Sequence, residues 1–363
     1  MKRYEEKLKY ENDPKGNPFT LSFGNKPYEY ISRLEDKDNL IHDIKAVPPL
    51  SHCFIITGVR RSGKTVMLTS VSKAFENDNE WIVVDLNPAD DLRECLAAKL
   101  YTVGRVKKLF LEANFSFSFQ GISFSLKGKT PLLNIDDLLD RMLAEIKRQG
   151  KKVLVTINEA SNNIYMKKFA LSFLMLTRAE YPLFIVATGL FENISSLENQ
   201  ENFTFLIRAP KTYLSPLNIG AMAYSYESSL RLNHEEALKC AKLTKGYAFA
   251  FQLLGYLMFE AGIKSPNTRI LSDFDQYLSE YAYSKVWASL TNIERKILSL
   301  FKTNGSVAVA SLLERGEMTK GYFSRYRDRL IKKGVIASTG TGKLAFALPR
   351  FNEFIETQAI DDE

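Results

Sequence analysis

One stretch of the chain decides the fold: Cys53-Phe-Ile-Ile-Thr-Gly-Val-Arg-Arg-Ser-Gly-Lys-Thr-Val66. Its apolar part, residues 54–57, is typical of a buried strand, and residues 58–65 fit the phosphate-loop pattern of Gly, four residues, Gly, Lys and Ser or Thr. Apolar residues then recur at helical spacing over residues 66–75. Strand, loop and helix follow in the order that this motif requires, so the stretch predicts an α/β fold with a parallel sheet of the P-loop NTPase type.

The residue types of the loop suit a bound polyphosphate. Glycines let the backbone wrap closely around the anion, so that N–H groups and the N-terminus of the following helix point at it. We expect Lys64 to neutralise the β and γ phosphates of ATP and Thr65 to offer its hydroxyl to Mg²⁺. Arg60 and Arg61 either add positive charge near the phosphates or are solvated. The predicted nucleotide-binding residues are Gly58, Val59, Arg60, Arg61, Ser62, Gly63, Lys64, Thr65 and Val66.

Composition sets the general class of protein. The chain has 363 residues, of which 45% are hydrophobic and 25% charged, as in a soluble globular protein of two or three domains. It contains no apolar run of membrane-spanning length and no signal-peptide pattern, so we expect a cytoplasmic protein without a membrane partner. The three cysteines are far apart and odd in number, which argues against a disulfide framework or a zinc site and predicts buried thiols.

Four segments are predicted along the chain. Residues 1–50 form a lead-in, 51–217 a P-loop ATPase core, 218–284 a helical lid, and 285–363 a winged helix domain. Within the core, residues 115–126 alternate phenylalanine or other apolar residues with serine around a Gln-Gly pair, which predicts an inserted β-hairpin. Its apolar face either contacts a ligand or a neighbouring subunit, or covers the core of its own domain.

Two polar residues follow another predicted strand of the core. Residues 152–157 form this apolar strand, and Asn158 and Glu159 come directly after it. In ATPases with a catalytic glutamate, such a strand ends in Asp-Glu: the Asp holds the magnesium shell and the Glu polarises the attacking water. Asn158 can accept a hydrogen bond from a magnesium-bound water but brings no negative charge, which predicts slow hydrolysis.

Two other polar residues each allow two interpretations. Thr188 ends the predicted strand 183–188, where it either senses the γ-phosphate or the attacking water, or is a buried threonine without such a role. Arg208 could reach a phosphate bound by a neighbouring subunit, or it could be a surface charge.

The C-terminal segment has a pattern of its own. Thr291 followed by Glu294 predicts a capping box at the start of a helix. A second short helix over residues 307–314, a third that begins at Thr319, and a Gly-rich hairpin follow, which is the order of a winged helix-turn-helix. On the third helix, one face is apolar and the opposite face is predicted to bind DNA through Arg325, Arg329 and Lys332. Residues 320–343 hold seven basic residues and one acidic residue, a local charge of +6. This nearly equals the net charge of the whole chain, +7.

Four motifs together resemble the AAA+ ATPases of the origin-recognition and initiator type. They are the phosphate loop, Ile157-Asn-Glu-Ala160, Ala187-Thr-Gly-Leu190 and residues 203–217, and the resemblance extends over roughly residues 17–350. It implies that Lys64 and Thr65 bind ATP and Mg²⁺, and that Glu159, Thr188 and Arg208 are catalytic residues.

The resemblance assigns a role to each of these three. Glu159 would be the base, Thr188 a first sensor, and Arg208 a finger acting across the subunits of a homo-oligomer. The sequence differs from the pattern of this family at two places. Asn158 replaces the expected Asp, and residues 246–254, where an arginine is expected as a second sensor, contain no arginine. That last segment is more like the signalling ATPases related to initiators.

Two functions are compatible with these patterns. One is an ATPase that couples ATP binding and hydrolysis, with ADP as product, to duplex DNA binding through the winged helix. The other is a signalling (STAND-like) ATPase whose assembly acts on a protein partner, with the winged helix as a structural arm. Salt-dependent binding to duplex DNA separates the two.

Overall fold

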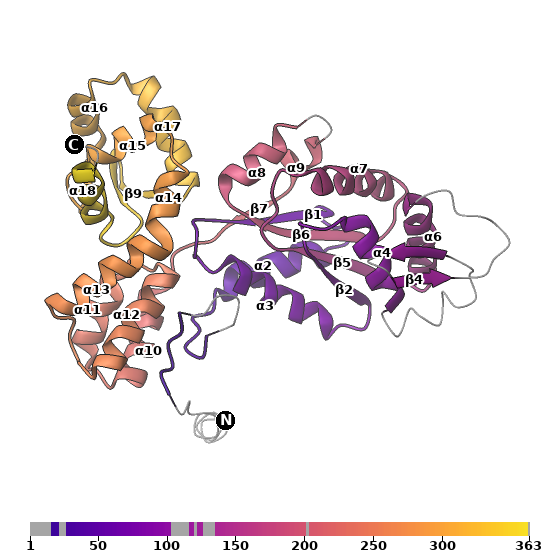
Figure 1. Cartoon of the computed structure of the whole chain (residues 1–363), viewed down its shortest axis with the longest axis horizontal. Coiled ribbons are helices and arrows are strands. Elements are labelled where there is room, and N and C mark those ends of the chain that lie inside the picture. Colours follow the sequence, from indigo (N-terminus) through magenta and orange to yellow (C-terminus); the bar gives the residue numbers. More distant parts are fainter. Residues whose placement is uncertain are drawn as a thin grey trace. The chain divides into compact units, whose positions relative to one another are not determined.

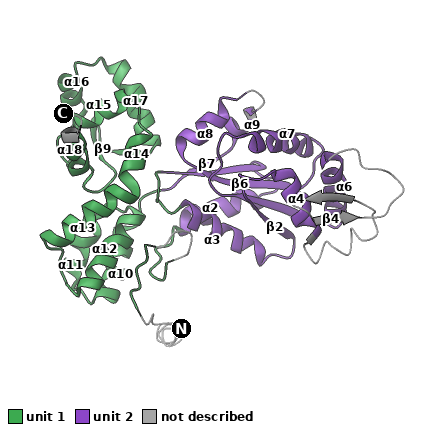
Figure 2. Cartoon of the chain, viewed as in Figure 1, with its two compact units in different colours: residues 1–33, 59–63, 215–363 green, residues 34–58, 64–214 purple. Residues whose placement is uncertain are grey.

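The computed structural model describes residues 16–21, 27–102, 116–119, 122–125, 135–200 and 203–361 (Figure 1). The chain divides into two compact units, coloured separately in Figure 2. Unit 1 comprises Met1–Arg33, Val59–Gly63 and Ser215–Glu363, and unit 2 comprises Leu34–Gly58 and Lys64–Leu214. The predicted lid and C-terminal segments thus belong mainly to one unit. The finer division into four segments stays a prediction.

Unit 2 is built on a five-stranded sheet with the order β2-β5-β6-β1-β7, in which all neighbouring strands are parallel. In chain order its strands are β1 (Cys53–Thr57), β2 (Trp81–Leu86), β5 (Lys152–Ile157), β6 (Leu183–Gly189) and β7 (Lys211–Tyr213). The three inner strands are buried almost throughout, as expected when helices cover both faces of a parallel sheet. The predicted parallel α/β fold is confirmed.

Helices cover both faces of this sheet (Figure 1). Side chains alternate along β1, so that Phe54 packs with the helices on one face while Ile55 packs with those on the other. The helices of the first face are α2 (Leu34–Lys45) and α3 (Lys64–Glu76), and those of the second are α4 (Leu92–Thr102), α6 (Ile135–Arg148) and α7 (Ile164–Arg178). Two short helices, α8 (Phe191–Glu198) and α9 (Thr204–Arg208), precede β7. Because α3 starts directly after the loop that follows β1, the packing of α3 fixes where the loop ends.

The predicted hairpin is present as strands β3 (Ser116–Phe119) and β4 (Ile122–Ser125). The two strands pair antiparallel, with Phe117 opposite Phe124. The contacts predicted for its phenylalanine side chains lie outside the described residues.

The first part of unit 1 is helical. It contains α10 (Ile219–Leu230), α11 (His234–Leu243), α12 (Ala248–Ala261), α13 (Thr268–Leu278), a π-helical turn η1 (Ser279–Tyr283) and α14 (Ser284–Ala288). Asn218, Asn233 and Asn267 each cap one of these helices by accepting a backbone N–H bond. Phe19 lies so close to Gly255 of α12 that a Cβ there would come within 2.6 Å of its ring atoms. The N-terminal segment is thereby anchored on the helices of unit 1.

The C-terminal part of unit 1 contains four helices and a three-stranded antiparallel sheet of order β8-β10-β9. The elements are α15 (Asn292–Ser299), β8 (Val307–Ala308), α16 (Val309–Gly316), α17 (Lys320–Lys332), β9 (Ile336–Gly340), β10 (Lys343–Phe346) and α18 (Phe351–Asp361). The predicted capping box of Thr291 and Glu294 is confirmed.

One helix of this region begins later than predicted. The pattern predicts a helix over 307–314, but Val307 is buried and pairs with Leu344 of β10, so α16 starts only at Val309. Pairing with a distant strand overrides the local helical pattern here. Three helices and a hairpin nevertheless follow each other as predicted.

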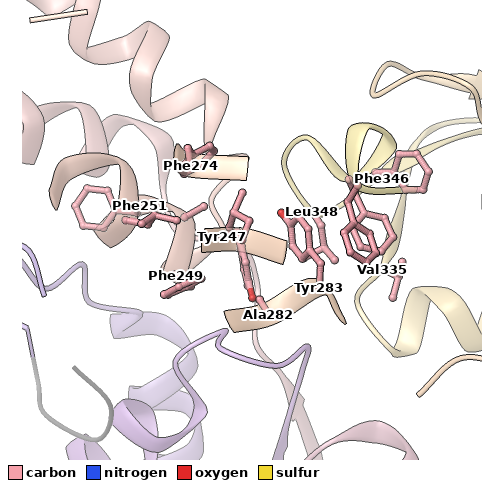
Figure 3. Close-up of a cluster of buried hydrophobic side chains, with 14 of the residues drawn as sticks. Tyr247, Phe249, Phe251, Phe274, Ala282, Tyr283, Val335, Phe346 and Leu348 are labelled. Carbon is pink, nitrogen blue, oxygen red and sulfur yellow. The ribbon is translucent and has the colours of Figure 1, made fainter. Parts of the chain in front are cut away.

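A single hydrophobic core joins the two parts of unit 1 (Figure 3). Aromatic residues of α12 and its N-cap, Tyr247, Phe249 and Phe251, belong to the same buried cluster as Tyr283 and Phe346. Across the described residues, no helix is both long and apolar enough to cross a membrane. The three cysteines are unpaired and buried, as predicted.

Candidate nucleotide site

The phosphate loop leads directly into the N-terminus of α3. The helix begins at Lys64, with Val66 in its first turn, and no acidic residue lies in that turn to repel an anion. Lys64 Nζ donates a hydrogen bond to the carbonyl oxygen of Gly58 at 3.1 Å. Gly63 has a φ of 93°, a backbone conformation that only glycine adopts readily. The loop thus has the lysine and the glycine conformation that its motif predicts.

Two buried hydroxyls in and beside the loop lack hydrogen-bond partners among the residues that the structure describes. They are Thr57 Oγ1, 1% exposed at the end of β1, and Ser62 Oγ, 5% exposed within the loop. A buried hydroxyl without a partner costs about 1–3 kcal/mol, so such atoms commonly mark a missing ligand or water. The residues present therefore fit a polyphosphate ligand.

Three of the predicted site residues form one hydrogen-bonded group. The side-chain oxygen Oδ1 of Asn158, directly after β5, accepts a bond from Thr65 Oγ1 at 3.1 Å and another from Thr188 Oγ1 at 2.8 Å. Strands β5 and β6 are parallel neighbours, so their carboxyl ends bring Asn158 and Thr188 to the same edge of the sheet. An asparagine oxygen accepts these two bonds as an aspartate would, but without its charge.

Glu159, the predicted catalytic residue that follows Asn158, has an unusual backbone conformation. Its φ is 59°, in the left-handed region that costs a non-glycine residue energy, and its side chain is exposed. The N–H of Glu159 donates to Thr188 Oγ1 at 2.9 Å, and the N–H of Ala160 donates to the Thr188 carbonyl oxygen at 2.7 Å. Thr188 therefore orients the turn that carries Glu159, whether or not it also senses a phosphate.

The oxygen atoms at this edge suit a magnesium ion. Mg²⁺ prefers oxygen ligands, uses few from the protein and keeps several waters. Thr65 Oγ1 and Asn158 Oδ1 are such oxygens and lie next to each other. Elsewhere in the described chain there is no group of three or more His, Cys, Asp or Glu residues that could hold a metal ion. The site fits an ion bound mainly through water and phosphate oxygens.

Arg208 is the last residue of α9 and is exposed. Within the described parts of the chain it has no hydrogen bond or ion pair, and the structure does not join it to Asn158, Glu159 or Thr188. Its exposure leaves both interpretations open, a surface charge or a residue that reaches another subunit.

The predicted DNA-binding residues on α17 differ in their surroundings. Arg325 and Lys332 are exposed, whereas the Nε of Arg329 lies 3.6 Å from an oxygen of the fully buried Glu294. Lys333, whose side chain is 4% exposed, pairs with the other Glu294 oxygen at 2.9 Å. The Arg329 side chain is 42% exposed while it lies beside this carboxylate, so its role as a DNA contact stays a prediction. A buried carboxylate attracts the nearest cations.

Sequence reasoning missed two aromatic residues that contact the phosphate loop. Tyr247 and Tyr281 each form a hydrogen bond with loop residues. Nothing in the local sequence predicts these contacts, because they join parts of the chain about 190 and 220 residues apart.

A parallel sheet with a phosphate loop after β1 and polar residues at the ends of β5 and β6 is a P-loop fold of the AAA+-like kind. The Walker-type ATPase PABY2304 of Pyrococcus abyssi has a similar structure, with a TM-score of 0.61 and 14% sequence identity over 93% of this chain and 99% of that chain. The ORC2 protein of Aeropyrum pernix, solved as ADPNP–ADP complexes, is similar with a TM-score of 0.53 and 12% identity over 97% and 98% of the two chains. At these identities the likeness is one of fold.

Two other comparisons concern the sequence. Residues 280–355 match a family described as a domain of unknown function, DUF8462. No curated protein matches the chain.

Proposed function

We propose that the protein is a nucleotide-dependent switch that binds ATP with Mg²⁺, hydrolyses it slowly, and couples nucleotide state to duplex DNA binding. The observation that carries the proposal is the hydrogen-bonded group of Thr65, Asn158 and Thr188, which links α3, whose first residue is Lys64, to the strand ends. The ORC2 protein of similar fold was solved with ADPNP and ADP, which supports a nucleotide as the ligand.

Each residue of the site has a distinct proposed role. Lys64 and the loop N–H groups bind the phosphates, and Thr65 and Asn158 would hold Mg²⁺. When bound, the ion supplies positive charge that neutralises the phosphates. Glu159 orients and deprotonates the attacking water, and Thr188 holds the Glu159 backbone. Hydrolysis is slow because Asn158 stands where a carboxylate would strengthen magnesium binding.

Arg208 is proposed to act on a nucleotide bound by a neighbouring subunit of a homo-oligomer. Its exposure at the end of α9 is compatible with that role. An arginine supplied across subunits stabilises the charge that develops on the transferred phosphate.

The C-terminal domain is proposed to be a winged helix that contacts duplex DNA. Three helices followed by a β-hairpin support this assignment. Four basic side chains of residues 320–343 are exposed and available to DNA phosphates: Lys320, Arg325, Lys332 and Lys343. Phosphate contacts of this kind dominate affinity for DNA.

A second candidate function is supported by the ion pairs of α17. Arg329 and Lys333 are bound to Glu294, and Arg327 pairs with Asp328 at 2.9 Å. Three of the seven basic residues of 320–343 therefore have an ion pair within the domain. A signalling ATPase that acts on a protein partner would need no DNA-binding face.

Two titrations test the proposal. Fluorescently labelled ATP is titrated with and without Mg²⁺, and we expect binding that magnesium strengthens; no binding in either buffer contradicts a nucleotide switch. Random duplex DNA is then titrated from about 50 to 200 mM salt, where binding through phosphates falls steeply with salt. Absence of DNA binding at about 50 mM salt favours the signalling function.

A further inference from the structure

The middle of the phosphate loop packs within unit 1. Val59–Gly63 belongs to the same compact unit as the helices and the C-terminal domain that follow residue 215. Three contacts hold it there, and the residues of unit 1 that make them lie outside the phosphate-loop motif.

Arg61 makes the first contact. Its Nε donates a hydrogen bond to the carbonyl oxygen of Tyr281 at 2.7 Å, and its guanidinium carbon lies 4.5 Å from the ring centre of Phe249. The ring of Tyr281 is also near, at 5.5 Å, so the cation lies against two aromatic faces. Burial lowers the pKa of Arg61. The backbone of Arg61 is left-handed, with a φ of 60°, a strained conformation that surrounding contacts must maintain.

Tyr247 makes the second contact, at the residue that precedes α12. Its hydroxyl donates to the carbonyl oxygen of Arg60 at 2.7 Å. The side chain is 5% exposed and lies in the aromatic cluster of Figure 3, and burial raises its pKa far above the usual value for tyrosine. A buried hydroxyl that is a permanent donor fixes the orientation of the Arg60–Arg61 peptide.

The third contact joins the loop to the end of α17. A Cβ added at Gly334 would lie 3.1 Å from the Cβ of Val59, closer than most such contacts, so the backbone of Gly334 packs directly on Val59. Gly334 and Tyr281 both belong to the segment 280–355 that matches the family of unknown function. Tyr281 lies in η1, in the first helical part of unit 1, and Gly334 follows α17, so residues from both parts of unit 1 contact the loop.

We infer that Arg61 and Tyr247 are positioning residues through which the first helical part of unit 1 holds the phosphate loop in its nucleotide-binding conformation, beside the contact of Gly334 with Val59. The inference rests on the proposed function, because it assumes that the loop binds ATP. A ligand that requires one loop conformation stabilises every contact that maintains this conformation, and the effect is reciprocal. ATP bound at Lys64 thus strengthens the packing of Tyr281 and Gly334 on the loop, and loss of that packing weakens ATP binding.

A matched pair of substitutions tests this coupling. Arg61→Ala removes the contact with Tyr281 and Phe249. Arg295→Ala is the control, because Arg295 makes the same kind of contact away from the loop: its Nε donates to the Trp287 carbonyl oxygen at 3.1 Å and its guanidinium carbon lies 5.5 Å from the Trp287 ring. We expect Arg61→Ala to raise the Kd for labelled ATP about fivefold or more, and Arg295→Ala to leave it within about twofold of the parent. An unchanged or lowered Kd in Arg61→Ala overturns the inference.

Hydrogen exchange with and without ATP provides the second readout. In the parent protein and in Arg295→Ala, we expect ATP to slow amide exchange in peptides that cover Ser279–Tyr283 and the end of α17. In Arg61→Ala that protection is lost even at ATP concentrations that saturate the variant. Tyr247→Phe, which removes only the hydroxyl, should behave as Arg61→Ala does. Equal ATP-induced protection in the parent and in both variants contradicts coupling.

Failure of the proposed function is recognised separately. If the parent binds no ATP, the nucleotide site itself is wrong. If the parent binds ATP and Lys64→Ala does not, while Arg61→Ala matches the parent in both readouts, only the positioning role is wrong.

Discussion

The strand-end site of unit 2 and the basic helix α17 of unit 1 differ in how the fold uses their polar residues. At the strand ends, Thr65, Asn158 and Thr188 are joined by hydrogen bonds in the combination that their positions predict. On α17, the half-exposed Arg329 lies 3.6 Å from Glu294, and Lys333, which directly follows the helix, is buried against the same carboxylate. The first group lies at the proposed nucleotide site, whereas the second partly serves the packing of its own domain.

The difference shows which sequence patterns predict the position of a side chain in the folded protein. The ends of parallel strands gather at one edge of a sheet whatever surrounds them, so a polar residue directly after a strand is placed by topology. Helical periodicity, in contrast, predicts only on which side of its own helix a residue lies. Whether a cation on that face meets solvent depends on what the neighbouring helix presents, here the buried Glu294 of α15.

The largest expected effect tests whether the charges of α17 are structural. Lys333→Ala leaves the buried Glu294 without its closest cation, and breaking a buried ion pair in this way costs about 3–5 kcal/mol of unfolding free energy. Urea unfolding measures the loss. Glu294→Gln combined with Lys333→Met removes both charges and should recover most of the stability. If Lys333→Ala unfolds at the same urea concentration as the parent, the ion pair has no structural role.

Acid should weaken the same ion pair. Burial raises the pKa of Glu294, but hydrogen bonds from the Thr291 backbone and from Lys333 outweigh it, so the pKa in the folded protein is lowered. The stabilisation is therefore complete above the unfolded value of about 4.3 and is lost as pH falls below it. Urea unfolding as a function of pH should show a smaller loss of stability in Glu294→Gln than in the parent. Equal pH dependence of the two proteins contradicts this assignment.

The next effect tests the ligand site at its strongest contact. Lys64→Ala removes charged hydrogen bonds to two phosphates, at about 1.5–3 kcal/mol each, which predicts a loss of ATP affinity of a hundredfold or more. Lys73→Ala, at an exposed position near the end of the same helix, is the control and should leave the affinity unchanged. Labelled-ATP titration measures both. Similar affinities of the two variants would remove the phosphate-loop assignment.

A smaller effect is expected from restoring the missing carboxylate. Asn158→Asp keeps the acceptor for Thr65 and Thr188 and adds one negative charge beside the proposed magnesium position. A single preorganised electrostatic group is worth on the order of a hundredfold in rate, so steady-state ATP hydrolysis should rise by about that factor. Glu159→Gln combined with Asn158→Asp should abolish the gain. Equal rates for the parent and Asn158→Asp show that Asn158 is no handicap.

The features that the sequence predicts are those set by residues close together in the chain. The sheet, the loop, the capping box of Thr291 and Glu294, and the third C-terminal helix follow from local patterns and are present. Three features arise instead from packing between distant segments: the contacts of Tyr247 and Tyr281 with the loop, the strand at Val307, and the ion pair of Lys333 with Glu294. No periodicity or motif encodes such packing, so only the folded chain reveals it.

The smallest expected effect separates the two roles of α17 residues. Arg325 and Lys332 are exposed, so each is free to contact a DNA phosphate, whereas Arg329 is held near Glu294. Each phosphate contact that is lost lowers the slope of log affinity against log salt by roughly one unit. Changing Arg325 and Lys332 together to Ala should therefore lower the slope by about two units and leave ATP binding intact.

Arg329→Ala is the matched comparison on the same helix. It should lower the unfolding free energy by weakening the compensation of Glu294 and change the salt slope by less than about one unit. If instead Arg329→Ala lowers the slope as much as either exposed residue does, Arg329 leaves Glu294 when DNA binds, and the notion of a purely structural charge on α17 fails. If the parent does not bind duplex DNA, neither outcome can arise and α17 belongs to the signalling function, with its exposed cations facing a protein partner.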